Sequence, residues 1–205
     1  MALHYPHPGV PALPADALSL AVLLICGYLL GSVSSAIICC RLMGRTDPRT
    51  GGSGNPGATN VLRLAGRDAA VLTLAGDVAK GALAVALARA LDAEPLVQAL
   101  TGAAAFLGHL YPVFFGFRGG KGVATALGAL LVTTPVAGLL TVATWGIAWG
   151  LIRISAAAAL TAFALAPVYI GVTTHQPPLV LIAAAVSILL FWRHRANIRD
   201  LLGKR

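Results

Sequence analysis

The residues most able to bind an anion lie in the segment Gly116-Phe-Arg-Gly-Gly-Lys-Gly-Val-Ala-Thr125. It places two cations, Arg118 and Lys121, among four glycines and between two apolar runs. Because glycine lacks a Cβ, backbone N–H groups can approach a ligand closely there, and a helix beginning at Val123 would add the positive end of its dipole. That combination suits a phosphate. An ordinary turn between membrane helices has a similar composition, and the segment is not a Walker A loop, since Gly122 follows Lys121.

A second polar cluster, residues 51–60 followed by Arg63, combines glycines with hydroxyls, amides and a guanidinium. A short cytoplasmic helix near 56–66, with proline at its first position and asparagine before it, is typical of a capped helix start. Such a helix would present Asn55, Thr59 and Arg63 together. A flexible linker is the alternative, although linkers rarely place Asn, Thr and Arg at helical spacing.

Two further pairs of polar residues stand within or just after apolar runs. Asp77 and Lys80 are three residues apart and can form an ion pair on one helix face. Charges inside a membrane span are costly and often mark function, so a structural and a functional role both stay open for this pair. His194 and Asn197 follow the last apolar run, where the neighbouring arginines are explained as anchors at the membrane surface. An anchor needs neither the imidazole nor the amide.

The elements that must position these residues are membrane helices. The chain has 205 residues, of which 58% are hydrophobic and only 11% charged, and apolar runs recur from Leu18 to Trp192. The runs are continuous rather than alternating, which disfavours a β-barrel and predicts helices. We expect an all-α integral membrane protein with seven transmembrane helices, the fourth of them short for a full crossing. These are 18–40, 69–91, 96–115, 123–134, 137–151, 156–170 and 179–192.

The net charge of +8 does not indicate a nucleic-acid partner, because the charges follow membrane topology. Thirteen of the fifteen Lys and Arg fall in alternate connections and the C-terminal tail, which predicts a periplasmic N-terminus and a cytoplasmic C-terminus. Residues 1–16 are expected to form a flexible periplasmic tail without a cleaved signal peptide, and 17–205 a single domain. The three cysteines lie in the first apolar run and imply neither a disulfide framework nor a metal site. The polar clusters then share the cytoplasmic side.

Taken together, four motifs resemble the bacterial acyl-phosphate:glycerol-3-phosphate acyltransferases. They are residues 52–60 with Arg63, Asp77 with Lys80-Gly81, the segment 108–125, and His194-Arg-Ala-Asn-Ile198. The resemblance runs from about Gly31 to the C-terminus. It implies a multi-pass inner-membrane enzyme that transfers a fatty acyl group from acyl phosphate to the C1 hydroxyl of glycerol 3-phosphate. The products would be lysophosphatidic acid and inorganic phosphate, in phospholipid biosynthesis.

The polar clusters and the resemblance together indicate which residues form the site. The positions that match the family's substrate pocket are Ser53, Thr59, Arg63, Lys121, Ser155, His194 and Asn197. The candidates with a catalytic role are His194, Asn197, Lys121, Ser53 and Arg63, and the substrate-binding candidates are Asn55, Thr59, Asn60, His109, Arg118, Gly119, Gly120, Gly122 and Ser155. The proton acceptor stays open between His194 and a phosphate oxygen of the donor. We expect no cofactor and no metal, because the histidines are scattered without an acidic cluster. The expected partners are acyl phosphate, glycerol 3-phosphate and membrane lipid, with the chain acting as a monomer.

Two other classes of function are compatible with basic clusters on one side of a membrane. A transporter of a small phosphate-bearing anion could use them as a gate, but transporters more often place ionisable residues at the midplane on repeated, broken helices, and the sequence has no internal repeat. A scaffold whose basic rim binds anionic headgroups is the third possibility. Formation of lysophosphatidic acid would separate the enzyme from both.

Overall fold

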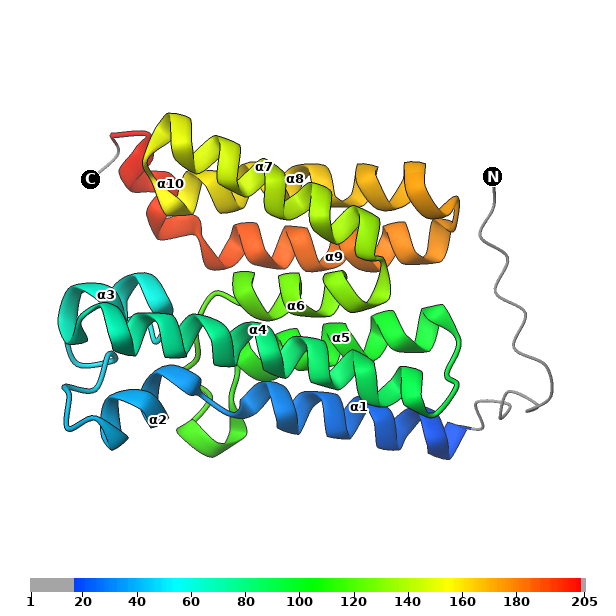
Figure 1. The fold of residues 1–205 in the computed structure, drawn as a ribbon, viewed down its shortest axis with the longest axis horizontal. Helices are drawn as coiled ribbons and strands as arrows, with labels where there is room; N and C mark the ends of the chain where they lie inside the picture. The colour runs from blue at the N-terminus through cyan, green and yellow to red at the C-terminus, as the bar shows by residue number, and fades with distance from the viewer. Residues whose placement is uncertain (1–16, 204–205) are drawn as a thin grey trace.

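The computed structural model describes residues 17–203, and every secondary-structure element in this range is helical (Figure 1). The expected N-terminal tail, residues 1–16, lies outside the described residues. The longer helices are α1 (Ala17–Ser32), α4 (Arg67–Ala90), α5 (Pro95–Leu110), α6 (Val123–Thr133), α7 (Pro135–Ile152), α8 (Ser155–Thr174) and α9 (Pro177–Arg193). The shorter ones are α2 (Ser35–Leu42), α3 (Ala58–Ala65), the 3-10 turn η1 (Val113–Phe115) and α10 (Arg195–Leu201). The expectation of an all-helical membrane fold is confirmed.

Fewer helices than the seven expected meet the length and composition of a full membrane span. Among the described residues, five helical segments are long and apolar enough, and a sixth is added if α9 and α10, bent by 62°, form one span. The remaining predicted span, 123–134, corresponds to α6, which has 11 residues. At 1.5 Å per residue α6 is about 16 Å long, roughly half of the hydrocarbon thickness.

The predicted first span, 18–40, is interrupted between α1 and α2 at Val33 and Ser34. A break in a membrane helix leaves backbone carbonyls without partners, which is costly in lipid. Here the Nζ atom of Lys80 on α4 donates a hydrogen bond to the carbonyl oxygen of Val33 at 2.8 Å. A charged side chain from a neighbouring helix therefore stabilises the break.

The short helix predicted near 56–66 exists but begins later than expected. Helix α3 starts at Ala58, after an extended Gly57 whose N–H bonds to the carbonyl of Asn55 at 2.9 Å. The prediction that the helix begins with Pro56 and is capped by Asn55 is therefore wrong. Thr59 and Arg63 still lie one turn apart on α3, whereas Asn55 belongs to the loop before it.

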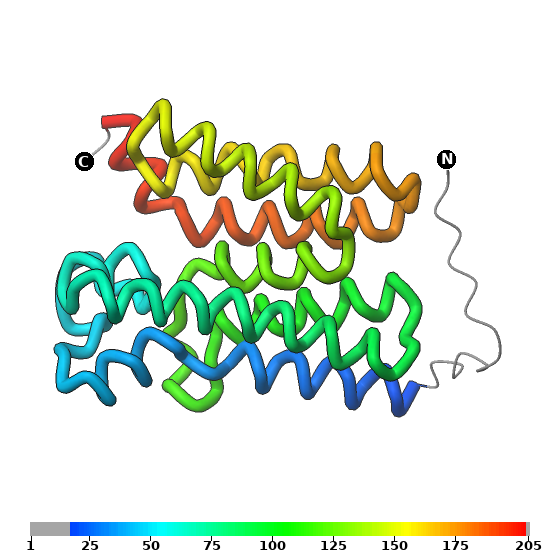
Figure 2. The backbone as a smooth tube through the Cα atoms, in the orientation of Figure 1, coloured from blue at the N-terminus to red at the C-terminus, as the bar shows by residue number. Residues whose placement is uncertain are grey.

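The helices form two groups that meet along α5 and α9. In the first group α1 packs on α5 and α4 on α6, and in the second α7 packs on α8 and α8 on α9 (Figures 1 and 2). The α4–α6 crossing is close, because a Cβ added at Gly81 would collide with the carbonyl oxygen of Thr125. Helices α3 and α10 and the connection from α5 to α6 gather at one end of the molecule, opposite the start of α1 (Figure 1).

Candidate active site

The loop before α3 is held by the side chain of Asn60, which is 2% exposed. Its Nδ2 donates to the carbonyl oxygens of Pro48 at 2.9 Å and Gly51 at 3.2 Å, and its Oδ1 accepts the Ser53 N–H at 3.0 Å. Gly52, at φ +58°, passes so close to Asn60 that an added Cβ would collide with Oδ1. Asn60, expected to bind substrate, has its amide occupied by this loop and presents Ser53 at the surface.

The same loop is joined to the segment that precedes the glycine loop, residues 116–122. Arg49 forms an ion pair with Asp47 at 2.7 Å and donates through Nη1 to the carbonyl oxygen of Phe115 at 3.4 Å. On α3, the side chains of Thr59 and Arg63 are exposed. The first two polar clusters of the sequence therefore lie beside one another.

The glycine loop turns back on the end of α5. Its backbone is left-handed at Gly116, Phe117 and Gly122, and the N–H of Gly120 donates to the carbonyl oxygen of His109 at 3.1 Å. The N–H groups of Lys121, Gly122 and Val123 donate to no backbone carbonyl among the described residues. They stand at the start of α6, where the helix dipole is positive, so they are available to an anion.

Arg193, at the end of α9, holds this loop from the other side. Its guanidinium donates to the carbonyl oxygens of Gly119 at 3.0 Å and Gly120 at 2.9 Å, and its Cζ lies 5.6 Å from the ring centroid of Tyr111. In a trans peptide the C=O and N–H point in opposite directions. By binding the Gly120 carbonyl, Arg193 therefore directs the Lys121 N–H away from itself. The sequence pattern predicts a membrane anchor for Arg193 and does not reveal this role.

His194 lies at the bend between α9 and α10 and is 3% exposed. Its Nδ1 is 2.9 Å from the carbonyl oxygen of Leu190. Because a carbonyl only accepts hydrogen bonds, Nδ1 carries the proton and Nε2 of the neutral ring is left as an acceptor. One turn later on α10, Asn197 accepts a hydrogen bond through Oδ1 from the ammonium group of Lys121. The loop and the C-terminal cluster thus meet directly.

Lys121 stands among other cations. Burial lowers the pKa of its ammonium group, and the positive charges of Arg193 and Arg63 lower it further. The positive charge of Arg63 on α3 therefore acts on Lys121. Lys121 and Arg63 therefore contribute positive charge to the same region, an arrangement that favours a bound phosphate, while Arg193 holds the loop from its other side.

Arg118 and Ser155, both predicted site residues, make no side-chain hydrogen bond or ion pair among the described residues. Arg118 is exposed on the glycine loop. Ser155 is half-buried at the first position of α8. The turn from α7 to α8 lies at the same end of the molecule as α3 and α10 (Figure 1), so both residues are near that end. Across residues 17–203, no group of three or more His, Cys, Asp or Glu side chains could hold a metal ion.

Behind the glycine loop lie three buried residues that the sequence placed at the site or beside it. Asp77 and Lys80 form an ion pair at 2.9 Å, and both are buried. His109, expected to bind substrate, is also buried, and its Nδ1 lies 3.2 Å from the hydroxyl of Thr125. The position of His109 favours a role behind the loop rather than contact with a substrate.

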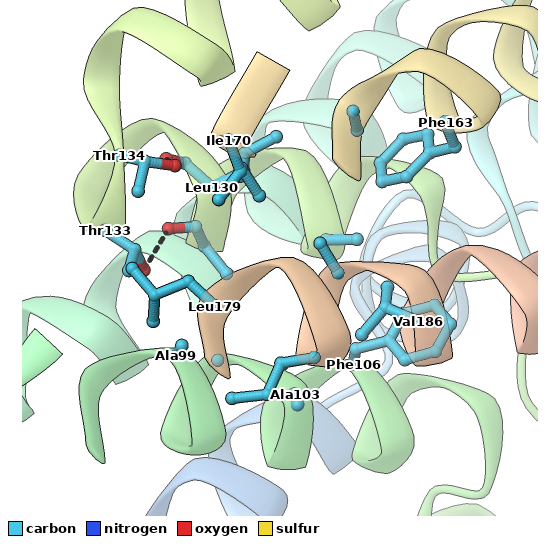
Figure 3. A pocket seen from close by; sticks show the side chains of 16 residues that line it. Ala99, Ala103, Phe106, Leu130, Thr133, Thr134, Phe163, Ile170, Leu179 and Val186 are labelled. Carbon is cyan, nitrogen blue, oxygen red and sulfur yellow. Dashed lines mark hydrogen bonds between the residues drawn. The ribbon is translucent and has the colours of Figure 1, made fainter. Parts of the chain in front are cut away.

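An apolar pocket lies between the two helix groups, alongside α6 (Figure 3). Its cavity volume is about 60 Å³, well below the roughly 300–1,000 Å³ of a typical ligand pocket, so it is a narrow apolar crevice. Phe106, Phe163 and Val186 line one part, and Ala99, Thr133 and Leu179 line another (Figure 3). Phe106 also packs so closely on Gly122 that a Cβ there would collide with its ring. Phe106 therefore lies between the pocket and the glycine loop.

Known proteins are similar to this chain over most of its length. A sequence model of the family described as glycerol-3-phosphate acyltransferase matches residues 21–204. The glycerol-3-phosphate acyltransferase of Halorhodospira halophila is 53% identical over 177 residues, covering 86% of this chain and 90% of the relative. That of Thioalkalivibrio sulfidiphilus is 53% identical over 182 residues, covering 89% and 90%.

Solved structures agree with the sequence comparisons. The crystal structure of PlsY (YgiH), an integral membrane glycerol 3-phosphate acyltransferase, in its glycerol 3-phosphate form is 38% identical, with a TM-score of 0.84 over 91% of this chain and 94% of PlsY. Its lysophosphatidic acid form gives a TM-score of 0.82 over the same shares. The resemblance inferred from the motifs is confirmed: the chain belongs to the glycerol-3-phosphate acyltransferase family.

Proposed function

We propose that this chain transfers a fatty acyl group from acyl phosphate to the C1 hydroxyl of glycerol 3-phosphate, giving lysophosphatidic acid and inorganic phosphate. The observation that carries the proposal is the meeting of Lys121 with Asn197 at a glycine loop whose free N–H groups adjoin an apolar pocket. A phosphate site beside an apolar pocket suits a donor with a phosphate head and a fatty chain. The relatives are named glycerol-3-phosphate acyltransferases, which supports glycerol 3-phosphate as the acyl acceptor.

The reaction is a displacement at a carbonyl carbon. The C1 oxygen forms a new bond to the carbonyl carbon of the acyl phosphate, and the bond from that carbon to the phosphate oxygen breaks. Lys121, Arg63 and the N–H groups at the start of α6 bind the phosphates of both substrates and stabilise the negative charge that develops on the leaving phosphate. An acyl phosphate is already activated, so the main task of the protein is to position two substrates.

We assign the hydroxyl proton to a phosphate oxygen of the donor. His194 is 3% exposed and its ring is fixed by the Leu190 carbonyl, which suits an acceptor that orients a substrate through Nε2. One side of the proposed site is formed by α3 and the loop before it, which carry Ser53, Asn55 and Thr59. Its rim is formed by Arg118 and Ser155. Asn60 and the glycines at 119, 120 and 122 contribute by shaping the backbone.

In the membrane, we propose that α6 is a seventh, shortened crossing. It starts at the glycine loop, and α7 starts where α6 ends, so α6 carries the chain back towards the opposite end (Figure 1). The N-terminus is then periplasmic, and the site and C-terminus are on the cytoplasmic side of the inner membrane. We expect the chain to act as a single domain and as a monomer.

The test is turnover by the purified protein in detergent with glycerol 3-phosphate and palmitoyl phosphate. We expect release of inorganic phosphate in equal amount to lysophosphatidic acid, detected by mass spectrometry, and no product when palmitoyl-coenzyme A replaces the acyl phosphate. Absence of turnover by folded protein would refute the activity. Accumulation of glycerol 3-phosphate in sealed proteoliposomes without acylation would instead support the transporter.

A further inference from the structure

A buried polar cluster lies directly behind the glycine loop. It consists of Asp77 and Lys80 from α4, His109 from α5 and Thr125 from α6, and all four side chains are buried. Neither the ion pair nor the imidazole reaches the surface on which substrates would bind. These side chains can therefore affect the reaction only through other residues.

The contacts within the cluster run from the broken first span to the end of α5. Lys80 binds the Val33 carbonyl at 2.8 Å and Asp77 at 2.9 Å. Oδ1 of Asp77 lies 3.6 Å from Nδ1 of His109, and the same ring nitrogen lies 3.2 Å from the hydroxyl of Thr125. One imidazole edge is thus held by two helices.

The other edge of the imidazole faces the glycine loop. A Cβ added at Gly120 would collide with Nε2 of His109, so the ring and the loop backbone are in direct contact. The main chain of His109 also accepts the Gly120 N–H at 3.1 Å. A rotation of the ring would therefore displace the loop that carries Lys121.

Stability alone is a poor explanation for this arrangement. A buried ion pair costs desolvation energy that its own attraction barely repays, and charges within membrane helices are expensive. Such groups are better accounted for when they fix one geometry among several. We propose that Asp77, Lys80, His109 and Thr125 are positioning residues that hold the glycine loop in the conformation that binds a phosphate. This inference rests on the proposed function.

The chain offers a matched pair of substitutions to test it. Thr125 and Thr73 are both fully buried threonines in packed helices, but the Thr73 hydroxyl has no hydrogen-bond partner among the described residues. Thr125→Val and Thr73→Val are the same isosteric change. We expect Thr125→Val to raise the KM for glycerol 3-phosphate about fivefold, as loss of one hydrogen bond predicts, with kcat within about twofold. Thr125→Ser should restore the KM, and Thr73→Val should leave it unchanged.

The wild-type protein assayed in the same preparation separates the two proposals. An inactive wild type would refute the proposed function, whereas an active one leaves the cluster to be decided by the variants. An unchanged KM in Thr125→Val, or an equal rise in Thr73→Val, would overturn the positioning role. His109→Gln provides a second measurement: a raised KM supports the proposal, and lower thermal stability with unchanged KM contradicts it.

Discussion

The ammonium group of Lys121 donates a hydrogen bond to the amide oxygen of Asn197, although 76 residues separate them in the chain. The contact joins the glycine loop to α10 and places a cation at the junction of the two helix groups. Arg193 strengthens the same junction through the carbonyls of Gly119 and Gly120. The phosphate site is therefore assembled by both groups and not by the loop alone.

Removing the amide of Asn197 should release Lys121. A hydrogen bond with a charged partner contributes about 1.5–3 kcal/mol, so we expect Asn197→Ala to lower kcat/KM for glycerol 3-phosphate at least about tenfold. If Asn197 acts through Lys121, adding Asn197→Ala to Lys121→Ala should cause little further loss. Steady-state kinetics of the two single variants and the double variant measure this. Fully additive losses would contradict the coupling.

Substrate affinity should weaken as the pH rises above neutrality. Burial and the charges of Arg193 and Arg63 lower the pKa of Lys121, so its ammonium group loses a proton at a lower pH than an ordinary lysine does. The charge that attracts phosphate is present below that pKa and lost above it. We expect the KM for glycerol 3-phosphate to rise on the alkaline side in the wild type. In Lys121→Arg, which keeps its charge, the KM should stay flat, and identical profiles would exclude Lys121 as the titrating group.

The two roles considered for His194 predict different losses. General-base catalysis contributes about 10²–10⁴-fold, whereas an orienting hydrogen bond contributes about tenfold. We expect His194→Gln, which keeps a polar group near the position of Nε2, to lower kcat by about tenfold or less. Rapid-quench measurement of the chemical step is the check. A loss of a thousandfold or more would make His194 the base and move the proton from the donor phosphate to the imidazole.

Two substitutions in the glycine loop can distinguish the effect of backbone strain from the effect of a steric collision. Gly116 and Gly122 both have positive φ, at +64° and +83°, but an added Cβ meets open space at Gly116 and the Phe106 ring at Gly122. Strain alone costs about 1 kcal/mol. We therefore expect Gly116→Ala to retain most activity and Gly122→Ala to lose it by more than about tenfold. Similar losses in the two variants would mean that Phe106 does not constrain the loop.

The helices and the polar clusters were predictable, because apolar runs and polar connections are local properties of the sequence. The predicted span 96–115, for example, corresponds to α5 and η1. The start of α3 was not predictable in the same way. The pattern at Asn55 and Pro56 satisfied the capping rule, but the Asn60 side chain, from within the helix, fixes the loop instead.

Arg193 shows why part of the site escaped prediction. In the sequence it is a cation after Trp192 at the end of an apolar run, which is typical of a membrane anchor. Its partners are backbone carbonyls 73 and 74 residues away. Because every residue has a backbone carbonyl, the residue types do not show which carbonyls an arginine binds. Thr125 was missed for a similar reason, since its partner His109 faces it only once α5 and α6 are packed.

The apolar pocket should determine which acyl chains are used. Ala103 on α5 lines the pocket, whereas its neighbour Ala104 is also half-buried but does not (Figure 3). Ala103→Leu would occupy space that about two chain methylenes fill, and at about 0.8 kcal/mol for each buried methylene the loss is roughly fifteenfold. We expect kcat/KM to fall by that factor for palmitoyl phosphate and to stay unchanged for butyryl phosphate, whose acyl chain is much shorter. Ala104→Leu should affect neither donor. Equal losses with both donors would show that the acyl chain binds elsewhere, because a pocket that holds the chain must discriminate by length.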